Sequence, residues 1–211
     1  MSSENWDQRF AERPWISHPD PLLTEVAGEL APGRAIDLGC GPGRNAIWLA
    51  ERGFRVTGVD ASAVGLGQAR ERAAAAGVHL DLVLADLRSY LVGESAFDLA
   101  VVANLHPGPG ELGEILARAV VGLAPGGHLF VVGHHLDNLG LDGPGDPELL
   151  YTVEGLAAEL PPGLAVERLE RVERHPGRQS GGPDAAVLLW GHRLALGEPS
   201  GPSLPGSRDG S

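Results

Sequence analysis

The stretch AIDLGCGPGRNAIWLA, residues 35–50, decides the fold that the sequence predicts. An apolar run carries Asp37, three glycines follow within five residues, and a segment with helical periodicity comes next. This order indicates a strand, a tight turn and a helix. Gly39, Gly41 and Gly43 have no Cβ, so the turn admits unusual backbone angles and close approach of a ligand. We therefore expect a binding site at the end of this strand.

The composition is that of one ordinary globular domain. The chain has 211 residues, of which 43% are hydrophobic and 21% charged. Its apolar segments are of strand length, which is too short for a membrane span. Residues 1–15 are polar and acidic, unlike a signal peptide, and the single cysteine, Cys40, lies inside the glycine turn. We expect a cytoplasmic protein without an internal disulfide.

Strand and helix patterns alternate along most of the chain. Strand patterns cover residues 34–39, 55–60, 80–86, 97–105 and 127–135. Helical patterns cover residues 44–52, 61–76 and 111–123, and a capped helix is expected over residues 19–33. Such alternation predicts an α/β fold with a mostly parallel sheet and right-handed crossovers.

The two ends of the chain differ from its middle. Residues 1–18 form a polar leader that carries Trp6 and Trp15 and is a possible lid. After residue 136 come a turn-rich loop, a short helix and two late strands joined by a polar, Gly-rich hairpin. Residues 197–211 have the composition of a disordered tail. One domain over residues 19–196 is the expected organisation.

The glycine turn does not match the common phosphate-binding patterns. A dinucleotide fingerprint reads G-x-G-x-x-G, whereas the third glycine, Gly43, comes one residue early. No G-K-[ST] follows, so a P-loop is excluded as well. Asp37 stands two residues before the first glycine, where a carboxylate would repel a pyrophosphate but would suit an ammonium group. Phosphate is therefore the poorer fit.

Two further aspartates follow the next strands at the same edge of the sheet. Asp60 ends the second strand pattern, where a carboxylate can accept hydrogen bonds from both hydroxyls of a ribose. Asp86 ends the third, where it can accept from the exocyclic amine of adenine. Each aspartate alone could be a helix N-cap. With Asp37, three aspartates in register are harder to explain by capping.

These motifs resemble a known family. AIDLGCGPGRNA, VTGVDAS, LADL, FDLAVVANLHPG and LAPGGHLFVVGHH look like the successive motifs of class I S-adenosylmethionine-dependent methyltransferases, over residues 20–195. The resemblance implies a Rossmann-like, doubly wound, seven-stranded sheet that is mostly parallel with one antiparallel strand. Within that superfamily, the leader and the glycine stretch resemble the tellurite-resistance and thiopurine-methyltransferase group.

The resemblance also implies a set of cofactor contacts for S-adenosylmethionine as co-substrate. Asp37 and the turn would hold its methionine part, Asp60 its ribose and Asp86 its adenine. Flanking and backbone contacts would come from Ala61, Leu87 and Ala103. The turn itself comprises Gly39, Cys40, Gly41 and Gly43.

Few residues are candidates for the chemistry of methyl transfer. A base is needed only where the nucleophile must lose a proton, as a hydroxyl does. His106 and His134 follow the fourth and fifth strands at the active edge, although either could simply bond a loop. Their spacing is not that of a metal site, so no metal is expected. Trp15 and Tyr151 are expected on the substrate side.

The most consistent interpretation is methyl transfer to a small-molecule acceptor, yielding S-adenosylhomocysteine. The net charge of −12 disfavours nucleic acid. Residues 104–107 read NLHP, which departs from the Asn/Asp-Pro-Pro-aromatic tetrad of base-modifying enzymes. No membrane partner is expected, and both monomer and homodimer remain open. The alternatives are a non-catalytic nucleoside-binding module and a nicotinamide-dependent oxidoreductase.

Arg171 and Arg174, on a late strand, are expected to be solvated.

Overall fold

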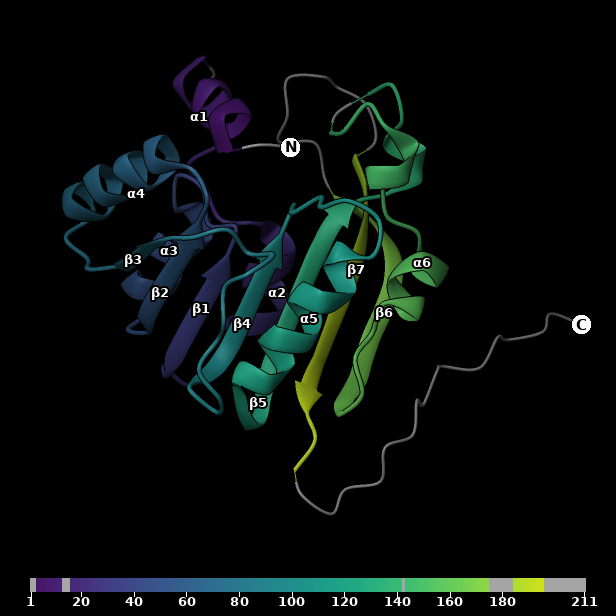
Figure 1. Ribbon diagram of the computed structural model, residues 1–211. Helices are drawn as coiled ribbons and strands as arrows, with labels where there is room; N and C mark the ends of the chain where they lie inside the picture. Colours follow the sequence, from purple (N-terminus) through teal and green to yellow (C-terminus); the bar gives the residue numbers. More distant parts are fainter. Residues whose placement is uncertain (1–2, 13–15, 142, 175–183, 196–211) are drawn as a thin grey trace, which may run out of the picture.

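The computed structural model describes residues 3–12, 16–141, 143–174 and 184–195, and shows one seven-stranded sheet (Figure 1). The strand order is β3-β2-β1-β4-β5-β7-β6. The strands are β1 Arg34–Leu38, β2 Arg55–Asp60, β3 Asp81–Leu84, β4 Phe97–Ala103, β5 Leu123–His134, β6 Leu164–Arg174 and β7 Asp184–Arg193. Only β7 runs antiparallel to its neighbours β5 and β6, which confirms the predicted topology.

Helices cover both faces of the sheet. They are α1 Ser3–Glu12, α2 Pro21–Ala27, α3 Arg44–Glu51, α4 Ala63–Ala75, α5 Glu111–Gly122 and α6 Val153–Ala158. Alternate residues of β1 point to opposite faces, so Ala35 packs in the core under α2 and α3 while Ile36 packs in the core under α5 and α6. The sheet is therefore buried on both sides, as a parallel sheet requires.

Several element boundaries differ from those that the sequence predicts. The helix expected over residues 19–33 ends at Ala27, and Gly28 is its C-cap. Its N-cap is Asp20, whose carboxylate accepts from the Leu22 N–H at 3.1 Å. The third strand stops at Leu84, two residues before Asp86. Asp86 accordingly lies in the loop beyond the strand.

The late strands form the antiparallel edge of the sheet. Residue 174 of β6 lies opposite Asp184 of β7. The Gly-rich hairpin expected between these strands falls on residues 175–183, outside the described residues, as do Trp15 and the tail at residues 197–211. Across the part of the chain that is described, none of the helices combines the length and apolarity needed to cross a membrane.

We expect the core beneath the sheet to carry most of the stability. Phe130 on β5 is fully buried, so Phe130→Ala should lower the free energy of unfolding by about 3–5 kcal/mol through lost burial and a residual cavity. Leu91, 80% exposed, provides the control, since Leu91→Ala should change stability by less than about 0.5 kcal/mol. Denaturant unfolding measures both, and equal effects would contradict the assigned core.

Candidate active site

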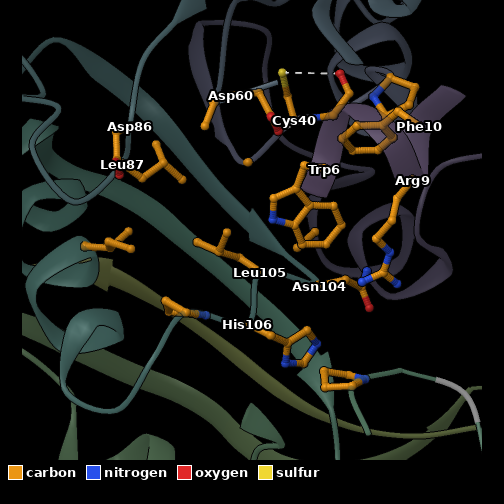
Figure 2. Close-up of a pocket in the computed structure, with 18 of the residues that line it drawn as sticks. Trp6, Arg9, Phe10, Cys40, Asp60, Asp86, Leu87, Asn104, Leu105 and His106 are labelled. Atoms are coloured by element: carbon orange, nitrogen blue, oxygen red, sulfur yellow. Dashed lines mark hydrogen bonds between the residues drawn. The ribbon is translucent and has the colours of Figure 1, made fainter. Parts of the chain in front are cut away.

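A cavity of about 970 Å³ lies at the carboxyl ends of β1, β2 and β4, beneath α1 (Figure 2). Its border includes many of the residues that the sequence singled out. Those placed on it are Gly39, Cys40, Gly41, Asp60, Ala61, Asp86, Leu87, Ala103, His106 and His134. The volume is at the upper end of the range of ~300–1,000 Å³ that is usual for ligand pockets.

The glycine turn needs glycine for its backbone angles. Gly39, Gly41 and Gly43 have φ values of 80°, 49° and 83°, in the left-handed region. A Cβ on Gly41 would lie 2.9 Å from the Phe10 ring, so α1 sits directly on the turn. Gly43 differs from the other two, because it packs against Ala69 of α4 and does not border the cavity. Gly43 is instead the N-cap of α3, where its left-handed backbone turns the chain into that helix.

Asp60 ties the turn to the next helix. Its carboxylate accepts from the Gly41 N–H and from the Ser62 N–H, each at 2.8 Å. Only 8% of the residue is exposed, and this burial raises the pKa of Asp60 above its usual value. Each carboxylate oxygen has more than one lone pair, so capacity remains for hydroxyl donors of a ligand.

Asp37 lies below the turn and does not itself border the cavity. It is 1% exposed, and its Oδ2 has no hydrogen-bond partner among the described residues. Burial raises the pKa of Asp37 to about 7, against the opposing effect of the Arg44 cation. A buried carboxyl of this kind gains most from a nearby cation, so the site fits a ligand with an ammonium group.

Asp86 already has a partner at the rim of the cavity. Arg88 donates to both of its oxygens, with Nε at 3.0 Å from each and Nη2 at 2.6 Å from Oδ2. This pairing holds the pKa of Asp86 below its usual value. An adenine amine at Asp86 would have to share the carboxylate with Arg88. Arg88 stands only two residues after Asp86 but was not among the residues predicted for the site.

His106 has a defined tautomer. Its Nδ1 lies 2.7 Å from the Leu149 carbonyl oxygen, which can only accept, so Nδ1 carries the proton. Its Nε2 then carries a lone pair. Among the described residues, this nitrogen accepts only from the His134 N–H, at a long 3.5 Å. Burial, with the neighbouring His134, lowers the pKa of His106 to about 4. The two imidazole rings stack with centroids 5.4 Å apart.

Tyr151 supports this loop from below instead of facing a substrate. It is 7% exposed and does not border the cavity. Its hydroxyl donates to the Leu105 carbonyl at 2.5 Å, and its ring lies 5.1 Å from that of His106. Burial raises the pKa of Tyr151 far above its usual value, so the phenol stays protonated. The expected substrate-side position of Tyr151 is therefore wrong.

The expectation that Arg174 is solvated is also wrong. Arg174 is 6% exposed and its guanidinium donates to Asp20, Asn104, His134 and Asp184. The reason is its place at the end of β6, because the antiparallel register brings it opposite Asp184 at the edge where the cavity opens. Arg171 on the same strand is 38% exposed and pairs with Asp137.

Helix α1 closes the cavity with aromatic side chains. Trp6 and Phe10 stack with centroids 5.7 Å apart, and the Arg9 guanidinium lies 4.8 Å from the Trp6 ring (Figure 2). Asp7 anchors the helix by accepting from the Val64 N–H at 3.1 Å and from the Ser62 hydroxyl. The aromatic wall that the described residues show thus comes from Trp6 and Phe10, whereas the residue predicted for this role, Trp15, lies outside the described residues.

Comparison with known proteins agrees with this geometry. A family model described as a methyltransferase domain matches residues 35–127. Ubiquinone biosynthesis O-methyltransferase from Methylobacterium sp. (strain 4-46) is 30% identical over 186 residues, which are 80% of this chain and 74% of the relative. The chain belongs to the S-adenosylmethionine-dependent methyltransferase family. Its co-substrate is S-adenosylmethionine, for which the glycines of the turn leave room and the Asp60 carboxylate and the orphaned Asp37 oxygen provide acceptors.

Other curated relatives match over shorter stretches. 2-heptyl-1-hydroxyquinolin-4(1H)-one methyltransferase from Mycobacteroides abscessus is 30% identical over 130 residues, 60% of this chain and 57% of the relative. For two trans-aconitate 2-methyltransferases the shares of the relative are 38% and 33%. The chain thus spans about a third to three-fifths of these relatives' length.

Solved structures share the fold. One, from work on the conversion of a disulfide bond into a thioacetal group during echinomycin biosynthesis, has a TM-score of 0.74 at 22% identity, over 91% of this chain and 92% of the other. TehB from Haemophilus influenzae has a TM-score of 0.67 at 16% identity, over 89% of this chain and 67% of the other.

In the described residues no group of three or more His, Cys, Asp or Glu side chains could hold a metal ion.

Removal of the Asp60 carboxylate should weaken cofactor binding. With Asp60→Ala the turn loses its acceptor at Gly41 and the ligand loses a charged acceptor. We expect the Kd for S-adenosylhomocysteine to rise roughly tenfold to hundredfold, the effect of one or two such hydrogen bonds. Calorimetric titration measures it, with Asp81→Ala at the amino end of the neighbouring strand β3 as control. An unchanged Kd would mean that the nucleoside does not reach β2.

Cofactor binding should release a proton from Asp37. In the free protein the raised pKa of about 7 keeps this carboxyl largely protonated at pH 6, and a ligand ammonium favours its ionised form. Affinity should therefore rise from pH 5.5 to pH 7, with release of up to one proton. Calorimetry in buffers of different ionisation enthalpy counts the proton. Asp37→Asn should abolish the release, and persistent release in that variant would point to another group.

Proposed function

We propose that this methyltransferase acts on a small-molecule acceptor and methylates a hydroxyl oxygen, with His106 taking the hydroxyl proton. The observation that carries the proposal is the tautomer of His106. Its proton is committed to the Leu149 carbonyl through Nδ1, which leaves Nε2, held only by a long 3.5 Å contact from the His134 N–H, as the acceptor nitrogen of a residue that borders the cavity. A buried acceptor nitrogen beside the methyl-transfer site suits a nucleophile that must lose a proton.

The chemistry needs one bond to form as another breaks. When bound, S-adenosylmethionine supplies an activated methyl group, which bonds to an oxygen lone pair while the S–C electron pair returns to sulfur. The hydroxyl proton passes to Nε2 of His106 and then to solvent. The lowered pKa of about 4 keeps His106 neutral at pH 7 and so able to accept. It is a weak base, but hydroxyl acidity rises steeply as the new bond forms.

Several observations support a small acceptor over nucleic acid, although a ribosomal RNA methyltransferase is among the relatives. The chain is acidic, with a net charge of −12, which opposes a phosphate backbone. Helix α1 lies over the cavity through Trp6 and Phe10. A relative that matches 80% of this chain is named for O-methylation.

The narrower parts of the proposal concern the leader and the subgroup. Residues 1–18 act as a lid, supported by the anchoring of α1 through Asp7 and by the hydrogen bond from Gln68 to the Phe10 carbonyl at 2.8 Å. Residues 19–196 form the methyltransferase domain and residues 197–211 a tail. A place in the tellurite-resistance and thiopurine-methyltransferase group is supported by the fold likeness to TehB.

The test is methyl transfer to matched oxygen and sulfur nucleophiles. His106→Ala should lower kcat for phenolic acceptors by about 10²–10⁴-fold, because the proton has no acceptor, and should leave transfer to thiolates and the Kd for S-adenosylhomocysteine unchanged. His79→Ala, on an exposed loop, is the control. At saturating cofactor, the wild-type rate should stay constant as the pH is lowered from 7 and should fall only near pH 4, where the lowered pKa of His106 leads to protonation of the base.

Other outcomes would redirect the assignment. Transfer to thiols but to no hydroxyl would remove the role of His106 as a base. Binding of S-adenosylmethionine without transfer to any acceptor in the panel would favour a non-catalytic nucleoside-binding module. Binding of NADH with no binding of S-adenosylmethionine would contradict the cofactor assignment itself.

A further inference from the structure

The amide of Asn104 is held in one orientation by a buried arginine. Asn104 directly follows β4 and has a φ of 54°, in the left-handed region that is costly for most residues. Its Oδ1 accepts from Nη1 of Arg174 at 3.0 Å. Because a guanidinium can only donate, the oxygen must be the atom that faces Arg174. The amino group, Nδ2, is therefore turned away from it.

Arg174 is itself fixed in place by two carboxylates. Nη1 lies 3.1 Å from Oδ2 of Asp20, the N-cap of α2, and Nη2 lies 3.0 Å from Oδ1 of Asp184 at the start of β7. Nη2 also lies 3.2 Å from Nδ1 of His134. The guanidinium is thus bonded to four elements of the fold and cannot turn without breaking buried ion pairs. The orientation of the Asn104 amide follows from that constraint.

The amino group of Asn104 has no partner within the fold. Nδ2 is buried and makes no hydrogen bond to any described residue. A buried donor without a partner is unfavourable, whereas the left-handed backbone itself is one that asparagine tolerates well. The Asn104 side chain borders the cavity and lies between Arg9 and His106 in Figure 2. A ligand acceptor atom that reaches this buried donor from the cavity would satisfy it.

We propose that Asn104 is a specificity-determining residue of the acceptor site, positioned by Arg174, and that it selects acceptors with a second oxygen beside the hydroxyl that is methylated. Asn104 offers a donor at Nδ2, and His106, two residues later, offers Nε2, an acceptor that the His134 N–H engages only at a long 3.5 Å. A vicinal diol of an arene, or a hydroxyl next to a carbonyl, matches both. An isolated hydroxyl satisfies only one of them. This inference rests on the proposed methyl transfer to oxygen.

The test compares two isomers that differ only in where the second oxygen lies. Catechol and hydroquinone are titrated into the protein loaded with S-adenosylhomocysteine, so that binding is measured without turnover. Catechol should bind the wild type at least about tenfold more tightly, the effect of one further hydrogen bond. In Asn104→Ala and in Asn104→Asp, which keeps an oxygen for Arg174, the two isomers should bind within about twofold of each other.

The positioning role of Arg174 is tested by the same ratio, that of the Kd values for hydroquinone and catechol. Arg174→Lys keeps the positive charge but cannot bond to Asp20, Asp184 and Asn104 together, so it should lose the preference for catechol while the Kd for S-adenosylhomocysteine is unchanged. Where this variant does not fold, the two Asn104 variants still decide the matter. Leu91→Ala on the exposed surface is the control and should keep the wild-type ratio.

Three outcomes would overturn the inference. The first is equal binding of the two isomers to the wild type, or no binding of either. The second is an unchanged preference for catechol in both Asn104 variants. The third is a more than fivefold loss of S-adenosylhomocysteine affinity in Asn104→Ala, which would assign the donor to the cofactor. A preference for catechol in binding with no methyl transfer to it would instead count against the proposed function alone.

Discussion

The carboxylate of Asp60 is the interaction on which the cavity depends. It accepts from Gly41 in the turn after β1 and from Ser62 at the start of α4, so one side chain sets the geometry of two adjacent strand–helix units. The Ser62 hydroxyl in turn donates to Asp7, which anchors α1. A single buried charge thus links the floor of the cavity to its cover. Its raised pKa shows the energetic cost of this burial, which the two backbone N–H donors partly offset.

Residues at the cofactor side could be predicted because they depend on local order. Each lies where a strand ends and a helix begins, and parallel strands place those ends at one edge of the sheet. Gly39, Gly41 and Asp60 were placed at this edge by strand direction, and they border the cavity. Asp86 was found too, but its pairing with Arg88 was not, because an exposed arginine has many rotamers and the sequence does not choose among them.

Residues at the acceptor side depend on contacts between distant segments. Arg174 was expected in solvent because β6 alternates imperfectly and its charged residues look like those of an edge strand. Its burial follows from the register with β7 and from the approach of Asp20, 154 positions earlier. Tyr151 likewise could be expected near the site, but its direction toward the Leu105 carbonyl depends on close packing against Gly133. Neither constraint can be derived from local pattern.

This difference has a consequence for how the two halves of the site tolerate change. The cofactor half uses the backbone of the glycine turn and carboxylates that each lie at or near the end of a strand, so its parts are positioned largely independently of one another. In the acceptor half, Arg174 and Arg44 share the carboxylate of Asp20, and Asp184 supplies a second negative charge. Loss of one member would leave a buried charge without its partner, at a cost of about 3–5 kcal/mol. The wall that carries Asn104 is therefore rigid, and a donor held on a rigid wall discriminates between acceptors more sharply than one on a flexible loop, because no ordering cost is incurred on binding.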